Sequence, residues 1–155
     1  SYVNAWNKVL RTQCWGSNTA GIIDTGNVSR TVSAEAVNMR MAGGSEDYYG
    51  IVVGTDNTPV TIDDYKLGAQ VTLAGGWQHY PASYDTPSVV GNTCSFNVTR
   101  LIVNNTGGPV EIKEIGGYIK GKTWYFCGIR DVLGSPVTVP DGGSITVTYT
   151  MKVTV

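Results

Sequence analysis

The last twelve residues of the chain, 144–155, alternate apolar and polar side chains without exception. A period of two is the pattern of a β-strand that buries one face. From residue 94 onward, similar runs recur at a spacing of about ten residues. Turn sequences such as 104–108 and 140–143 separate these runs, and no helical pattern lies between them. The pattern predicts an all-β fold, an antiparallel two-sheet β-sandwich of Ig-like or jelly-roll topology.

The same pattern predicts several individual elements. The apolar run at 48–55 indicates a fully buried strand, and the run at 123–133 indicates a central strand. Residues 135–155 indicate a hairpin, because the proline and glycines at 140–143 suit a tight reversal. The remaining expectations are extended segments at 28–35, 37–41 and 70–76, and a long loop at 77–92 with at most a short strand around Val89 and Val90.

The first sixteen residues are the segment in which helical spacing competes with strand spacing. Asn4 could cap a helix, and four side chains at i, i+3, i+4 and i+7 could form its buried face: Trp6, Val9, Leu10 and Gln13. A Trp-rich strand fits almost as well. We therefore expect an N-terminal arm or short helix over 1–16, followed by a single β-sandwich domain over 17–155.

The charge and hydropathy of the sequence argue against two classes of binding partner, nucleic acids and membranes. Only 15% of the residues are charged, and 11 basic against 12 acidic side chains give a net charge of −1. The sequence has no basic run, no apolar stretch of membrane-spanning length and no signal-peptide pattern. These features predict a protein with no nucleic-acid partner and no membrane partner.

The cysteines Cys14, Cys94 and Cys127 form no Cys-x-x-Cys pair. Three buried free thiols are the favoured interpretation, and one disulfide with one free thiol is the alternative. This cysteine pattern suits folding in a reducing cytoplasm better than a secreted disulfide scaffold.

Residues that could carry catalysis are sparse. His79 is the only histidine, and Ser83 and Asp85 follow it closely, but their spacing alone builds no catalytic triad. We expect His79 on the surface of a loop. Neighbouring carboxylates could serve as a glycosidase acid and base, yet they fall in turns or on strand surfaces: Asp63 with Asp64, Glu46 with Asp47, and Glu111 with Glu114.

A calcium loop is the other chemical alternative. Asp56, Asn57, Asp63 and Asp64 lie close together in sequence, but their spacing matches no EF-hand. No phosphate-binding or dinucleotide-binding glycine motif occurs. We therefore expect no enzyme activity, no cofactor and no metal.

Aromatic side chains gather at 77–84, where Trp77, Tyr80 and Tyr84 lie near two prolines. Exposed rings on a β-sandwich loop can anchor a protein partner or stack on a sugar face. The alternative is that these rings fill or cap the core. All three interpretations stay open at this point.

Three blocks of sequence carry a family resemblance. In order, they are 51–67 (IVVGTDNTPVTIDDYKL), 96–119 (FNVTRLIVNNTGGPVEIKEIGGYI) and 129–153 (IRDVLGSPVTVPDGGSITVTYTMKV). Together they resemble a set of small proteins encoded among the structural genes of tailed bacteriophages. The resemblance covers roughly 50–155 and is strongest over 104–108, 130–133 and 136–149.

The resemblance implies a setting and no particular chemistry. It implies a β-sandwich structural protein of the virion, either a capsid decoration protein or a neck or tail component, assembled in the host cytoplasm. Its partners would be other virion proteins and further copies of itself. The alternatives are a carbohydrate-binding or receptor-binding module that uses the aromatic loop, and a self-assembling surface or filament subunit.

Physical features of the last strand suit such a role. Hydroxyl groups cost less to bury than ions, so a threonine-rich face can be covered by a neighbouring subunit. A long regular strand can also pair across chains. We expect residues 151–155 to reach beyond their own sandwich partners, and we expect partner contacts at the following side chains: Tyr2, Trp6, Leu10, Trp15, Trp77, Tyr80, Tyr84, Thr148, Thr150, Lys152 and Thr154.

Overall fold

The computed structural model describes residues 1–35, 39–41, 43–121 and 123–155; the side chain of Trp15 lies outside the described part. The chain is mostly antiparallel β-strand with one short N-terminal helix, which confirms the predicted fold class. The elements are α1 (Asn4–Trp15), β1 (Thr19–Ile23), β2 (Ser29–Val32), β3 (Gly50–Gly54), a 3-10 helix (Leu73–Gly75), β4 (Trp77–His79), β5 (Ser83–Tyr84), β6 (Ser88–Val90), β7 (Thr93–Asn104), β8 (Val110–Gly121), β9 (Trp124–Val139) and β10 (Ser144–Thr154).

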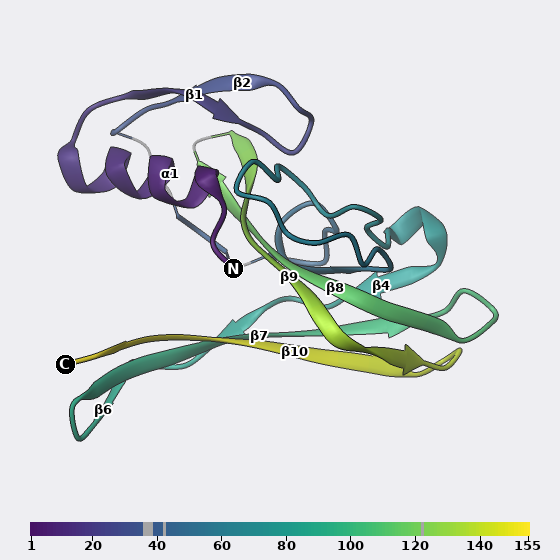
Figure 1. Cartoon of the computed structure of the whole chain (residues 1–155). Coiled ribbons are helices and arrows are strands. Elements are labelled where there is room, and N and C mark those ends of the chain that lie inside the picture. Colours follow the sequence, from purple (N-terminus) through teal and green to yellow (C-terminus); the bar gives the residue numbers. More distant parts are fainter. Residues whose placement is uncertain (36–38, 42, 122) are drawn as a thin grey trace.

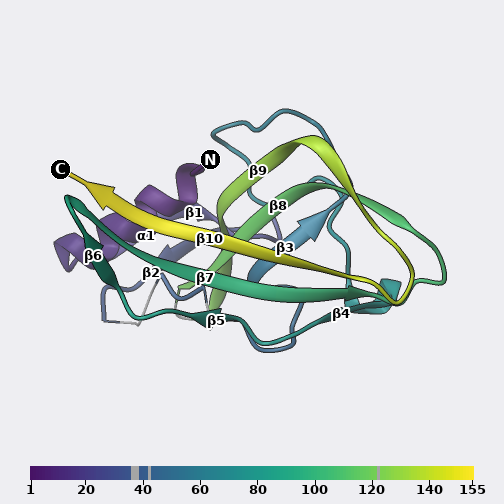
Figure 2. The same ribbon diagram turned by 90° about the horizontal axis from the view of Figure 1, so that it is seen from below.

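Two sheets form the body of the molecule (Figure 1). One has the order β3-β8-β9; the other has the order β10-β7-β4, with β5 and β6 also paired to β7. A separate hairpin of β1 and β2 packs with α1 over the first sheet (Figures 1 and 2). The core between these layers is aliphatic and aromatic, with side chains such as Ile51, Ile102 and Phe126 fully buried.

Helix α1 ends where Gly16 adopts a positive φ of 68° and donates its backbone N–H to Thr12. Its buried face carries Ala5 and Val9. Leu10, which the periodicity placed on that face, is exposed, and Trp6 is only half-buried. The expected helix is therefore present, but its apolar stripe is rotated from the expected one.

The turn at 140–143 does not close a hairpin, so that prediction is wrong. Strand β9 pairs with β8, whereas β10 pairs with β7 in the facing sheet. The side chain of Asn104 ties this end together, because its Nδ2 donates to the carbonyl of Gly108 at 2.8 Å and to that of Val139 at 2.9 Å. The chain thus arches from one layer to the other.

Three further expectations need correction. The short strand expected around Val89 and Val90 is present as β6, but the rest of 77–92 is not simply a loop, because β4 and β5 precede β6 along β7, separated at Pro81 and Pro87. Residues 70–76 contain a 3-10 helix in place of a strand. Strand β9 lies at the edge of its sheet, with β8 in the centre. The buried strand at 48–55 is confirmed as β3, while positions 37 and 38 lie outside the described residues.

Strands β7 and β10 continue past the end of the facing sheet and carry β6 with them (Figure 1). We call this extension, residues 83–98 and 149–155, the arm. Strand β10 stays paired with β7 from Ser144 to Thr154 without a register shift. The prediction that residues 151–155 outrun their own partner is therefore wrong, because β7 accompanies them.

The cysteines are free thiols, as expected. Only Cys127 is buried, however; Cys94 is half-buried and Cys14 is exposed. Among the described residues, no helix has the length and apolar character needed to cross a membrane.

Candidate functional site

One face of the arm is apolar across all of its strands. Residues directly opposite each other in paired strands point their side chains to the same side of a sheet. The register therefore places three rows on one face: Val89, Cys94 and Val153; Phe96 and Met151; and Tyr84, Val98 and Tyr149. None of these strand positions carries a charge.

This face is only partly covered by the rest of the molecule. Towards the tip, Val89 and Val153 are 72% and 62% exposed, and Tyr84 is 67% exposed. Val98, nearer the body, is buried. Since single exposed apolar side chains are common but contiguous ones are not, the arm face is a candidate contact surface.

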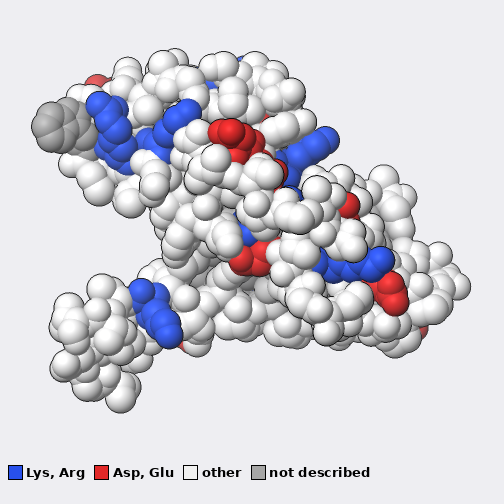
Figure 3. Space-filling view, viewed as in Figure 1, with Lys and Arg blue, Asp and Glu red and all other residues white. Residues whose placement is uncertain are grey.

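An apolar groove lies between the arm face and the N-terminal part of the chain. Two adjoining cavities of about 350 and 420 Å³ share Trp6, Pro87, Phe96 and Met151 as lining residues. Tyr2 lines the outer cavity, and Met39 and Met41 line the inner one, so all three methionines of the chain meet this groove. Figure 3 shows the molecule hollowed between the projecting arm and the part above it, with few charged atoms on the arm.

Tyr149 connects β10 to β9, and Met151 connects it to the N-terminal residues. The hydroxyl of Tyr149 donates to Asp131 Oδ2 at 3.1 Å, and burial, with the nearby Asp131 carboxylate, raises the pKa of Tyr149. The Tyr2 hydroxyl lies 3.8 Å from the sulfur of Met151. These contacts fix the position of β10 where the groove begins.

The opposite face of β7 and β10 carries the expected threonine-rich surface. Thr148 pairs with Thr99 at 2.9 Å, Thr150 donates to Asn97 at 2.7 Å, and Thr154 pairs with Thr93 at 2.8 Å. Thr148, Thr150, Lys152 and Thr154 are exposed, whereas Thr93 and Thr99 are half-buried. The threonine hydroxyls already have hydrogen-bond partners across the strands. Covering the apolar face with another protein would therefore give a larger favourable free energy than covering the threonine face.

The aromatic loop does not form one surface. Trp77 is only 5% exposed and belongs to the core, so its expected role as a partner contact is wrong. Tyr80 lies opposite Leu101 and Tyr84 opposite Val98, and successive residues of a strand alternate faces, so the two rings point to opposite sides of the sheet. Of the other expected contacts, Tyr2 and Trp6 line the groove, Leu10 is exposed on α1, and the side chain of Trp15 lies outside the described residues.

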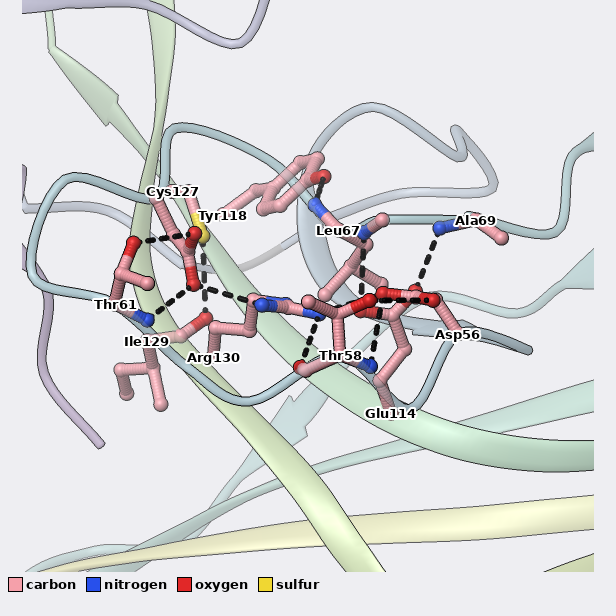
Figure 4. Close-up of polar contacts among 12 residues, drawn as sticks. Asp56, Thr58, Thr61, Leu67, Ala69, Glu114, Tyr118, Cys127, Ile129 and Arg130 are labelled. Carbon is pink, nitrogen blue, oxygen red and sulfur yellow. Dashed lines mark hydrogen bonds and ion pairs between the residues drawn. The ribbon is translucent and has the colours of Figure 1, made fainter.

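A buried ion cluster holds the long segment between β3 and β4. Arg130 donates to Glu114 at 2.9 Å, to Asp64 at 2.8 Å and to Asp56 at 3.1 Å (Figure 4). Although burial alone would raise it, hydrogen bonds from Thr61 and Arg130 hold the pKa of Asp64 below its ordinary value. Of the carboxylates considered for calcium, Asp56 and Asp64 therefore bind an arginine, whereas Asp63 accepts from the side chain of Asn4. Among the described residues, no group of three or more His, Cys, Asp or Glu side chains is placed to hold a metal.

A second buried arginine joins the two sheets. Arg100 donates to five backbone carbonyls, those of Gly44, Glu46, Tyr49, Ile51 and Tyr80, at 2.6–2.8 Å. Burial lowers its pKa to about 10, although Glu46 and Asp47 partly offset the effect. Arg100 therefore clamps the segment before β3, and β3 itself, onto β7.

His79 lies in the core beside this clamp. It is 1% exposed, and neither ring nitrogen has a hydrogen-bond partner among the described residues, so the prediction of a surface position is wrong. Burial, with the Arg100 charge as the second cause, lowers its pKa to about 4.

The sequence contains a pattern from which these buried charged residues could have been predicted. In the alternating run 94–104, Arg100 stands at an inward position, in the same phase as Val98 and Ile102. Glu114 stands likewise two residues after the buried Ile112. A charged side chain in the buried phase of a strand needs a partner, and it could have been identified as a structural anchor.

Comparison of the chain with protein-family models, with curated proteins and with solved structures finds no match. The groove and the arm are thus interpreted from their own chemistry.

Proposed function

We propose that this chain is a non-enzymatic structural protein of a bacteriophage virion, a capsid decoration protein or a neck or tail component, that acts through protein–protein contacts in multiple copies. One observation carries the proposal: the arm extends an apolar face beyond the sheet that would otherwise cover it. The resemblance of the three sequence blocks to proteins encoded among phage structural genes supports the virion setting.

The groove suits an apolar segment of a neighbouring virion protein. Trp6, Phe96 and the methionines present a large apolar surface, and methionine side chains adapt to the shape of a partner. Full burial of an exposed large apolar side chain contributes about 1.5–3 kcal/mol, and these side chains, which are already partly buried, would each contribute a fraction of that. A few such side chains are enough to hold a subunit that is present in many copies.

Co-sedimentation with particles of the bacteriophage that encodes the chain tests the proposal. Phe96→Asp places a charge on the apolar face, so we expect bound protein to fall at least tenfold. Ser95→Asp is the matched control, because Ser95 is the preceding residue on the opposite, polar face, beside Lys152. Equal binding of the two variants, or absence of the chain from purified particles by mass spectrometry, would contradict the proposal.

The carbohydrate-binding alternative has a different signature. With Trp77 in the core, Tyr84 is the ring of the loop that is most exposed. Binding of a defined glycan that Tyr84→Ala abolishes and Ser95→Asp leaves intact, with no binding to particles, would favour the alternative.

A further inference from the structure

Residues 43–47, on the chain before β3, are held by one side chain of β7. The structure describes each of these residues, and none of them belongs to a helix or strand. Nη2 of Arg100 donates to the carbonyls of Gly44 and Glu46, both at 2.6 Å. The other guanidinium nitrogens donate elsewhere, to the carbonyls of Tyr49, Ile51 and Tyr80. One nitrogen of Arg100 thus joins this segment to β7, while the others join the start of β3 and the end of β4 to it.

The segment has little burial of its own. Residues 44–47 are exposed or half-buried, and only Gly43 at the start is buried. Its other hydrogen bonds include one from the N–H of Ala82 to the carbonyl of Gly43 at 2.9 Å and one from the N–H of Leu73 to the carboxylate of Asp47 at 2.8 Å. Segments with few buried apolar contacts open at a lower free energy than the strands around them.

His79 lies beside the same guanidinium group. It pairs with Ile102 of β7, and Arg100 stands two residues from Ile102 in the same inward phase. The carbonyl of the next residue, Tyr80, accepts from Arg100 Nε at 2.8 Å. The charges of Arg100 and Asp47 both act on the imidazole, so one charged group faces His79 from β7 and one from the segment.

A proton on His79 would conflict with this arrangement. It would add a cation to a desolvated site in which neither ring nitrogen has a hydrogen-bond partner among the described residues. Strands β4 and β7 cannot separate without breaking the ladder between them. The segment can leave Arg100 by giving up the two bonds to Nη2, which lets water reach both cations. Release of the segment is therefore the smallest change that relieves the conflict.

We propose that residues 43–47 are an acid-sensitive latch: when His79 gains a proton, the segment detaches from Arg100 while both sheets stay folded. The latch is independent of the proposed virion role, because it needs only the charges and hydrogen bonds of this chain.

Opening of the latch also reaches the groove. The bond from Ala82 to Gly43 joins two parts of the chain that line the inner cavity, because Met41 lies two residues before Gly43 and Tyr84 lies two residues after Ala82. Loss of this bond loosens the inner end of the groove, whatever partner the groove binds.

Hydrogen exchange at one backbone amide measures the opening. The N–H of Ala82 donates to the latch, whereas the N–H of Tyr80 donates to Leu101 of β7 and is the matched control. The experiment compares exchange rates, by NMR of the full chain, in the native protein and in His79→Phe, which cannot titrate. Between pH 7 and 4.5 the ratio of the two rates at Ala82 should rise about fiftyfold, because the closed state binds the proton at a pKa of about 4 and the open state near 6.5. The latch is thus closed above pH 6.5 and opens as pH falls towards 4.

The control amide separates local opening from global unfolding. At Tyr80 the ratio of exchange rates should rise far less than at Ala82. Equal rises at the two amides would show that His79 acts only on the stability of the whole fold, and a constant ratio at Ala82 would show that the proton does not open the segment. Either result would overturn the latch. If His79→Phe does not fold, the native chain decides alone: between pH 7 and 4.5 the protection of Ala82, corrected for the intrinsic exchange rate, must fall more than that of Tyr80.

Discussion

Acidification should destabilise the protein through one buried side chain, His79. Its imidazole lies in the core without a hydrogen-bond partner among the described residues and beside the Arg100 guanidinium. Protonation there would add a second positive charge to a desolvated site. The perturbation is a pH change from 7 to 4.5, with His79→Phe as the variant that cannot titrate.

The magnitude follows from the two pKa values. The unfolded chain binds a proton at His79 near its ordinary pKa of 6.5, whereas the folded chain does so only at about 4. Because the folded-state pKa is lowered, stability is fully present above pH 6.5 and is lost as pH falls towards 4. The complete loss is about 3 kcal/mol, and most of it, about 2.5 kcal/mol, has occurred at pH 4.5.

Urea unfolding at several pH values measures this loss. We expect the free energy of unfolding to fall by about 2.5 kcal/mol more in the native chain than in His79→Phe between pH 7 and 4.5. Carboxylates whose pKa values are lowered in the folded state, such as Asp24 and Asp64, also reduce the free energy of unfolding on acidification. They do so equally in both proteins, so their contribution cancels in the difference. Parallel pH profiles would refute the reasoning, as would an NMR titration in which the single histidine protonates near pH 6.5 in the folded state.

Three further outcomes can be checked. Arg130→Met should lower the free energy of unfolding by about 3–5 kcal/mol, because it leaves the fully buried Glu114 without its cation, and adding Glu114→Gln should recover part of that loss in urea unfolding. Arg100→Met should cost at least about 3 kcal/mol in the same assay, because it strips the donor from five carbonyls. In a thiol-reagent assay, Cys14 should react first and Cys127 only on unfolding, because Cys127 is buried and burial raises its pKa to about 12; early reaction of Cys127 would show that the core opens.

The strand pattern predicted which faces are buried far better than which strands are neighbours. Along β10 the alternation placed Val147 inward and the threonines outward, as observed. It could not show that β9 and β10 lie in different sheets, since the same turn serves a hairpin or an arch. Only long-range contacts decide this, among them the bonds from Asn104 to the carbonyls of Val139 and Pro140.

The errors in the candidate site have a related cause. The segment 77–92 has no periodicity, because its strands are two or three residues long and each depends on β7 for its shape. Trp77 and His79 are buried by residues far along the chain, so local polarity and the neighbouring prolines gave no sign of it. The groove was not predictable either, because Trp6, Met41 and Phe96 meet only after the layers have packed.

The continuous pairing of β10 with β7 has a mechanical consequence. A pull along the arm loads every hydrogen bond of the ladder in shear at once, because antiparallel bonds lie across the strand direction. A pull across the sheet peels the same bonds apart one pair at a time. The molecule is therefore stiff along the arm and weak across it, and a lattice built from such subunits would resist tension best where their arms lie in line with the load.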